Sequence, residues 1–245
     1  MKRTLGLQTL SFLLFLLTSL ISLASAQQTT GILFKTLQLG DKNYNYAIQI
    51  PRDYTPSKDW PLIVSLNGAG ECGTDGSKQI AVGLGTATLL NAKKWPFIIL
   101  YPQKPTVQSA WEDHDEAVMA MLEQAKKDYK IDTKRLYLTG LSQGGHGTWY
   151  IGAKHAELWA AIAPVCGYGD PAKVASDLKS MPIWAFHGEA DRAVPVAQSH
   201  GFVDAIKAAG GTPKLTTYPG VDHNSWDKAY RDENLSDWFL EHVKK

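Results

Sequence analysis

Ser142 lies in a short pattern of residues that suits nucleophilic catalysis. It is the centre of Gly140-Leu141-Ser142-Gln143-Gly144, a G-x-S-x-G pattern between a predicted strand over 135–139 and a predicted helix over 142–153. A serine at such a sharp turn has strained backbone angles, and glycine two positions to either side avoids a clash with a Cβ atom. The pattern therefore predicts a nucleophilic hydroxyl at the carboxyl edge of a sheet.

A serine hydroxyl needs a general base to attack a carbonyl carbon, and the base needs a carboxylate that orients it. His223, one of seven histidines, lies in a loop directly after the last predicted strand, 214–218, and is the predicted base. Asp191 follows the seventh predicted strand and is the predicted acid. Glu189 and Asp170 remain alternatives for the acid.

Two other histidines lie close to these segments in the sequence. His146 comes one helical turn after Ser142 and is expected to pack near the site without acting as the base. His187 ends a predicted strand and is interpreted as a structural residue that holds the loop of the acid.

The negative oxygen of a tetrahedral intermediate needs two N–H donors. The backbone N–H of Gln143, the residue after the serine, is the first predicted donor. The second is expected from the glycine-rich loop 67–73, directly after a predicted strand. Ala69 is the favoured position there, with Gly68 and Gly70 as alternatives.

The elements that must position these residues alternate along the chain. Short β-branched or aromatic runs alternate with amphipathic helical stretches, which predicts an α/β fold with a mainly parallel, eight-stranded sheet flanked by helices. Strands are expected over 32–39, 44–50, 62–66, 97–101, 135–139, 160–165, 183–187 and 214–218. Helices are expected over 113–129, 142–153, 196–209 and 234–243. The first two strands alternate in polarity, so an antiparallel edge pair is expected.

Residues 1–26 differ from the rest of the chain. Lys2 and Arg3 precede an apolar run over 11–23, and Ala24-Ser25-Ala26 is a small-x-small cleavage pattern. These features predict a secretory signal peptide. A membrane anchor is the alternative, but the run is too short to span a bilayer comfortably.

The composition excludes broad classes of function. The 245 residues include 25 Lys+Arg and 24 Asp+Glu, a formal charge of +1, and removal of the 26 leader residues with their two cations makes it −1. This balance argues against a broad basic face for nucleic acid. A 44% hydrophobic content argues against a disordered chain. The sequence has no metal-binding or dinucleotide motif, so no cofactor is expected.

Three segments, 140–145, 187–191 and 218–226, resemble the α/β-hydrolase superfamily. More narrowly, they resemble the phospholipase/carboxylesterase or "predicted peptidase" group, with kinship to dienelactone hydrolase-like and feruloyl esterase-like proteins. The resemblance implies one α/β-hydrolase domain over 27–245 without a large lid.

The resemblance also implies roles for individual residues. Ser142 matches the nucleophile, Asp191 the acid and His223 the base, in the chain order that α/β-hydrolases use. Ala69 and Gln143 match the oxyanion positions. Such proteins usually have His-Gly in the oxyanion loop where this chain has Asn67-Gly68. An asparagine can still brace the loop by hydrogen bonds, so activity is expected.

Together these features predict a secreted or periplasmic serine hydrolase that cleaves carboxylic esters. A feruloyl or acetyl esterase acting on plant polysaccharide is one form of this prediction. The expected partner is a small-molecule or polysaccharide-linked ester, with no nucleic acid and no stable membrane insertion after leader cleavage. A serine peptidase of the same fold is the alternative, followed by a non-catalytic homologue. An open site favours esters, because an alkoxide leaves more easily than an amine.

Two tryptophans and two cysteines fall in loops near the predicted site. Trp111 and Trp226 are predicted to line the acyl or alcohol pocket, with core packing as an equal alternative. Cys72 and Cys166 are both expected at the rim of the site. The sequence leaves open whether they form a disulfide, because it does not set their separation.

Overall fold

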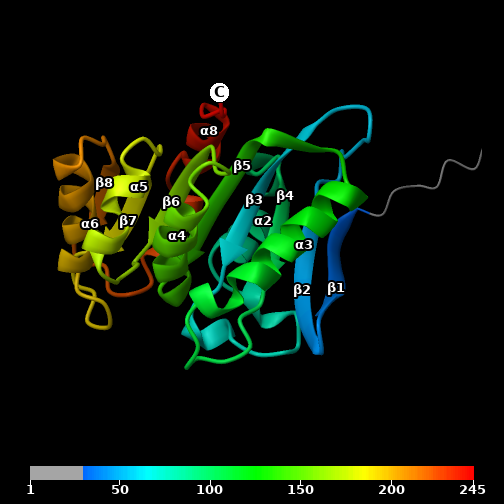
Figure 1. The fold of residues 1–245 in the computed structure, drawn as a ribbon, viewed down its shortest axis with the longest axis horizontal. Helices are drawn as coiled ribbons and strands as arrows, with labels where there is room; N and C mark the ends of the chain where they lie inside the picture. Colours follow the sequence, from blue (N-terminus) through cyan, green and yellow to red (C-terminus); the bar gives the residue numbers. More distant parts are fainter. Residues whose placement is uncertain (1–29) are drawn as a thin grey trace, which may run out of the picture.

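The computed structural model describes residues 30–245, so the predicted signal peptide lies outside the described part of the chain. Eight strands form one sheet in the order β1-β2-β4-β3-β5-β6-β7-β8 (Figure 1). The strands are β1 Gly31–Leu39, β2 Lys42–Ile50, β3 Trp60–Leu66, β4 Ile98–Pro102, β5 Ile131–Leu141, β6 Ala161–Val165, β7 Trp184–Gly188 and β8 Lys214–Tyr218. β2 pairs antiparallel with β1 and β4, and all other pairs are parallel. The predicted fold class and the antiparallel edge pair are confirmed.

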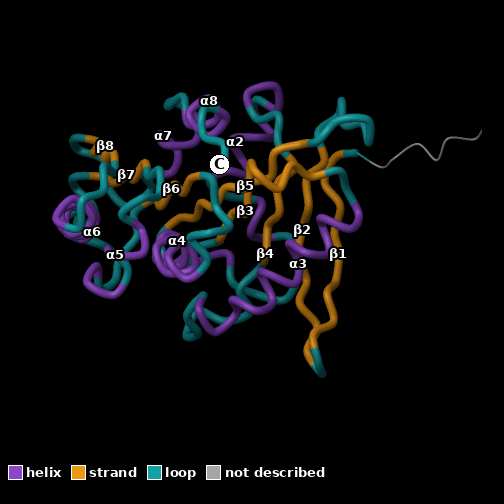
Figure 2. The backbone as a smooth tube through the Cα atoms, turned by 45° about the horizontal axis from the view of Figure 1, so that its top comes forward, coloured by secondary structure: helices purple, strands orange, loops and turns teal. Residues whose placement is uncertain are grey.

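Helices cover both faces of the sheet. One face carries α3 Asp115–Asp128, α4 Gln143–Lys154, α5 Ala175–Leu178 and α6 Ala197–Ala208. The other carries α2 Leu84–Leu90, α7 Trp226–Arg231 and α8 Leu235–Leu240. Figure 2 shows these two helix layers on opposite sides of the sheet. No helix among residues 30–245 has both the length and the apolar character needed to cross a membrane.

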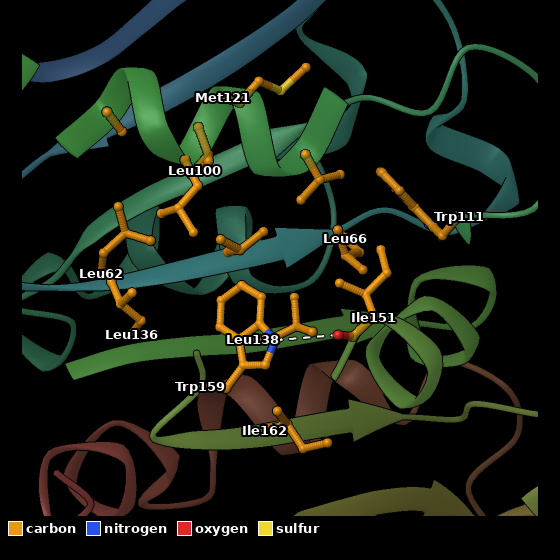
Figure 3. Close-up of a cluster of buried hydrophobic side chains, with 14 of the residues drawn as sticks. Leu62, Leu66, Leu100, Trp111, Met121, Leu136, Leu138, Ile151, Trp159 and Ile162 are labelled. Atoms are coloured by element: carbon orange, nitrogen blue, oxygen red, sulfur yellow. Dashed lines mark hydrogen bonds between the residues drawn. The ribbon is translucent and has the colours of Figure 1, made fainter. Parts of the chain in front are cut away.

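The central strands hold the site through their packing. Leu62 and Leu66 of β3 and Leu136 and Leu138 of β5 are at most 1% exposed and belong to one apolar cluster under α3 and α4 (Figure 3). Ile63 follows Leu62 in β3 and packs in the apolar cluster on the opposite face of the sheet, because successive residues of a strand point to opposite sides. Burying each such side chain contributes about 1.5–3 kcal/mol. The carboxyl ends of β3 and β5 are therefore anchored by apolar packing on both faces of the sheet.

Three short helices, α2, α5 and α7, were not among the predicted elements. They have seven, four and six residues, respectively, which is too short for a clear helical period in the sequence. α2 also contains Gly85, where a Cβ atom would lie 2.2 Å from the Ile80 carbonyl oxygen. The last helix ends at Leu240, three residues before its predicted end.

Candidate active site

Ser142 sits in a strained turn between β5, which ends at Leu141, and α4, which begins at Gln143. Its φ of 55° and ψ of −114° are unusual for a residue with a side chain. A Cβ atom at Gly140 would lie 2.4 Å from the Gly144 carbonyl oxygen, and one at Gly144 would lie 2.0 Å from a β3 carbonyl oxygen. Both glycines of the pattern are thus required by close backbone contacts.

The structure brings the three predicted catalytic side chains into one hydrogen-bonded chain. His223 Nε2 lies 3.0 Å from Ser142 Oγ, and His223 Nδ1 lies 2.7 Å from Asp191 Oδ2. The other carboxylate oxygen, Asp191 Oδ1, accepts hydrogen bonds from the N–H groups of Ala193 and Val194 at 2.9 and 2.8 Å. The buried carboxylate is therefore fixed with one oxygen directed at the imidazole.

His187 supports the same carboxylate from the core. Its Nε2 lies 2.9 Å from the Val194 carbonyl oxygen and 3.2 Å from Asp191 Oδ2, and its Nδ1 lies 2.7 Å from the Ser199 hydroxyl. Burial lowers the pKa of His187 and favours the neutral ring. A neutral ring with its proton on Nε2 satisfies all three contacts, so His187 holds the acid loop as expected.

The alternative acids point elsewhere. Glu189 accepts a hydrogen bond from the Thr217 hydroxyl at 2.7 Å, and Asp170 accepts one from the Ala172 N–H at 3.1 Å. Among the described residues, Asp191 alone of the three candidates contacts the imidazole of His223.

Asp222 ties the loop of the acid to the loop of the base. Its carboxylate accepts hydrogen bonds from Arg192 Nη2 at 2.6 Å and from the backbone N–H of His223 at 2.8 Å. The hydrogen bond from the Arg192 side chain is the largest cause that lowers the pKa of Asp222, to about 2. The loops also meet at Gly188, where a Cβ atom would lie 2.3 Å from the Val221 carbonyl oxygen.

The two predicted oxyanion positions each begin a helical turn. Ala69 is the first residue of a short 3-10 helix, Ala69–Glu71, and Gln143 is the first residue of α4. N–H groups at such positions have no partner within the helix. The Gly68 N–H, one of the alternatives, donates to the Glu71 carboxylate at 3.1 Å instead. Gly68 also packs on Leu141, directly before Ser142, which places the loop beside the serine turn.

Asn67 braces this loop as expected. It is 3% exposed, its Nδ2 donates to the Gly68 carbonyl oxygen at 2.6 Å, and its Oδ1 accepts from the Lys104 N–H at 3.0 Å. Trp111 donates from Nε1 to the Asn67 carbonyl oxygen at 3.1 Å and is only 1% exposed. Trp111 therefore packs in the core, and the substrate-contact role predicted for it is not supported by its burial.

Lys104 is a supporting residue that the sequence did not reveal. Its buried ammonium donates to the carbonyl oxygens of Thr106 at 2.9 Å, Val107 at 3.4 Å and Ser109. Val107 in turn accepts from the side chain of Gln143 at 3.1 Å. Burial lowers the pKa of Lys104. No sequence signal marks it, because an isolated lysine in a polar loop is normally exposed.

Trp226 and a nearby hollow are the candidate substrate contacts. Trp226 is half-buried, and its ring lies edge-on to the His223 ring at 5.4 Å between centroids. A cavity of about 420 Å³ lies beside the acid loop and was not predicted. It is lined by Tyr168, Gly169, Ala193, Val194, Pro195 and Gln198. These lining residues come after β6 and β7 in the sequence. Ligands of open α/β sheets bind at the carboxyl ends of the strands, so the positions of these residues after two strands could have indicated the cavity.

His146 and the two cysteines complete the surroundings of the serine. His146 Nε2 lies 2.9 Å from a Glu112 carboxylate oxygen, so it packs near the site without contacting Ser142. Burial alone would raise the pKa of Glu112, but the hydrogen bond with His146 and the histidine charge lower it. Cys72 and Cys166 are both free, so the structure contains no bridge between them.

Several known proteins are similar to this chain. A bifunctional acetylxylan esterase/xylanase, XynS20E, of Neocallimastix patriciarum is 29% identical over 72% of this chain and 26% of that protein. A protein of Methylorubrum extorquens named as a putative carboxymethylenebutenolidase is 33% identical over 48% of this chain and 47% of that protein. The chain thus spans about a quarter and about half of these curated relatives.

Solved structures share the fold. A thermostable esterase superposes with a TM-score of 0.75 and 31% identity, covering 87% of this chain and 63% of that one. A feruloyl esterase module from Clostridium thermocellum, solved with sinapinate, has a TM-score of 0.71 at 17% identity and covers 89% of this chain and 91% of that one. The fold is therefore the α/β-hydrolase fold. The model of the dienelactone hydrolase family matches residues 103–234, more than half of the chain, and this chain belongs to that family.

Proposed function

We propose that the protein is a secreted serine hydrolase that cleaves carboxylic esters. The observation that carries the proposal is the chain of hydrogen bonds from Ser142 Oγ through His223 to the buried Asp191 carboxylate. Such a chain can activate a hydroxyl that is otherwise a weak nucleophile. The ester-cleaving names of several relatives support the choice of substrate class.

In the proposed reaction, Ser142 Oγ attacks the ester carbonyl carbon while His223 Nε2 takes the hydroxyl proton. Asp191 holds the Nδ1–H and stabilises the charged ring. The N–H groups of Ala69 and Gln143 stabilise the negative oxygen. The imidazolium then gives its proton to the departing alkoxide, which leaves an acyl-serine. Water activated by the same histidine releases the acid and restores the serine.

Ser142→Ala tests the proposal with p-nitrophenyl acetate and butyrate. We expect kcat/KM to fall by about 10³-fold or more, since the nucleophile is lost. A fluorophosphonate probe should label the wild type and leave Ser142→Ala unlabelled. Wild-type rates in Ser142→Ala, or no labelling of the wild type, would contradict the proposal.

The acyl and alcohol groups are best identified with a matched set of substrates. Within the ester class we propose a feruloyl or acetyl esterase acting on plant polysaccharide, supported by the names of two relatives. Release of ferulate from methyl ferulate, or of acetate from acetylated xylan, is the measurement. An amide with the same acyl group separates an esterase from a peptidase, because preferential amide cleavage would favour the peptidase.

A further inference from the structure

Cys166 lies directly behind the serine–histidine–aspartate chain, although the proposed reaction gives it no role. It follows β6, is fully buried and has a φ of 40°, a left-handed conformation that is uncommon for a residue with a side chain. Its N–H donates to the Phe186 carbonyl oxygen at 2.8 Å, which fixes it to the end of β7. Strain of this kind persists only where the surroundings hold the residue in place.

The Cys166 sulfur shares a small volume with two residues of the chain. Cys166 Sγ, an Asp191 carboxylate oxygen and a His223 ring nitrogen all lie within 4.8 Å of one another. Thiolate, carboxylate and imidazole are the ligands that zinc takes in proteins, and ligand atoms bound at 2.0–2.3 Å lie about 3.3–3.8 Å apart. Shifts of about 1 Å would bring the three atoms to that spacing. The His223 side chain is 25% exposed, so solvent and dissolved ions reach its ring.

Ser225 and His187 surround the three potential ligand atoms with further polar groups. The Ser225 hydroxyl is fully buried and forms a hydrogen bond with the Cys166 thiol. A hydroxyl at this position can donate to the sulfur and stabilise its thiolate form, which is the form that binds a metal. His187 lies 3.2 Å from Asp191 Oδ2 and supplies the outer hydrogen bond that orients a metal-bound carboxylate.

We propose that Cys166, Asp191 and His223 form an inhibitory binding site for Zn²⁺ or a similar soft divalent cation. The cation takes the place of the proton between His223 Nδ1 and the Asp191 carboxylate. The thiol gives its proton to solvent as the sulfur–metal bond forms, and the imidazole proton moves from Nδ1 to Nε2. Two anionic ligands neutralise the cation, so the buried cluster carries no net charge. His223 Nε2 then carries a proton and cannot accept the one from Ser142, so hydrolysis stops.

Metal binding is tested without reference to activity. Titration with Cd²⁺ gives a near-ultraviolet absorption band when a thiolate binds the ion. We expect one thiolate-bound Cd²⁺ in the wild type and in Cys72→Ala, and none in Cys166→Ala or in Cys166→Ser, which keeps the size of the side chain. Cys72 is the matched control, because it is the only other cysteine of the chain. An unchanged band in folded Cys166→Ser would overturn the site.

The inhibitory role of the site rests on the proposed function. It is measured as the effect of Zn²⁺ on hydrolysis of p-nitrophenyl butyrate. The rate of each variant with Zn²⁺ is compared with the rate of the same variant without metal. We expect Zn²⁺ to inhibit the wild type, EDTA to restore it, and Cys166→Ser to need at least about tenfold more Zn²⁺. Equal inhibition of Cys166→Ser and the wild type by Zn²⁺ would overturn the proposed inhibitory role of the site. A Cys166-dependent Cd²⁺ band without ester hydrolysis would refute the proposed function alone.

Discussion

Arg192 and Asp222 join the two loops that carry the candidate acid and base. The Arg192 backbone N–H and two of its side-chain nitrogens donate to the Asp222 carboxylate at 3.1, 3.0 and 2.6 Å. Both residues are adjacent in sequence to a member of the candidate triad, Asp191 or His223. The pair therefore sets the spacing between aspartate and imidazole from outside the hydrogen-bonded chain.

Removal of this pair by Asp222→Ala should lower kcat by roughly 3- to 30-fold, because small displacements of catalytic groups are costly. The unfolding midpoint should change little, since exposed ion pairs contribute little stability. Asp227→Ala, which removes the exposed pair with Arg231 on α7, is the matched control for a lost surface charge. Equal kcat values for the two variants would contradict the role of the pair.

The low pKa of Asp222 adds a pH test to the same variant. Because the folded-state pKa is held at about 2, below the ordinary value for aspartate, the carboxylate stays charged through the mildly acidic range. Any stabilisation from the pair is present above about pH 4 and is lost as the pH falls through 2. The kcat ratio of wild type to Asp222→Ala should therefore be constant between about pH 5 and 8. A kcat ratio that falls to about one within this pH range would show that the charge of Asp222 does not cause the difference in kcat between the wild type and the variant.

Two glycine-to-alanine changes in helices should act in opposite directions. Gly144→Ala places a methyl group 2.0 Å from the Leu66 carbonyl oxygen, so we expect loss of activity and destabilisation by about 3 kcal/mol or more. Gly201→Ala in α6 meets no atom closer than 3.9 Å and should stabilise by about 0.5–1 kcal/mol. Urea unfolding measures both. A Gly144→Ala protein as stable as the wild type would show that the serine turn tolerates a side chain.

Lys104→Met tests the buried ammonium beside the oxyanion loop. The change removes the ammonium that donates to three carbonyl groups of one loop, and we expect destabilisation of about 2–4 kcal/mol. We also expect kcat to fall more than KM rises, because Gln143 loses the support of the loop at Val107. Lys78→Met, at an exposed lysine, is the control. Equal unfolding midpoints for both variants would contradict a structural role for Lys104.

His187 should make the stability of the protein depend on pH. Burial lowers its folded-state pKa, whereas an unfolded histidine titrates near 6.5. Below that pH the unfolded chain binds a proton that the folded chain excludes, so stability falls as the pH drops from 7 to 5. His187→Gln should reduce this slope by up to about 1.4 kcal/mol per pH unit. Urea unfolding at several pH values gives the slope, and His200→Gln, at an exposed histidine of α6, should leave it unchanged.

The sequence was informative where local chemistry decides the structure. The eight strands follow from β-branched runs, and the serine turn follows from its glycines, which the backbone contacts at Gly140 and Gly144 explain. Contacts across the sheet were not predictable in this way. The Lys104 backbone N–H bonds to the Asn67 side chain, and the Trp111 ring bonds to the Asn67 carbonyl oxygen. Asn67 lies far from both residues in the sequence, so no local sequence pattern predicts these contacts.

The surroundings of Cys166 are a second example of contacts that the sequence alone did not predict. Its sequence position indicated the carboxyl edge of the sheet, and the sequence left open whether it forms a bridge with Cys72. The strand order instead places β6 between β5 and β7, so the thiol faces Asp191 and His223. Only the assembled sheet determines which residues meet at the edge.

The members of the candidate triad lie far apart in the sequence, and this separation has a consequence for folding kinetics. Ser142 and His223 are 81 residues apart, and they come from the ends of β5 and β8 with two strands between them. Closing such a long loop is entropically costly, and pairings of this range form late in folding. Refolding protein should therefore bury its core tryptophans before it recovers the capacity to react with a fluorophosphonate. Reactivity of the serine thus reports that the last strand has docked.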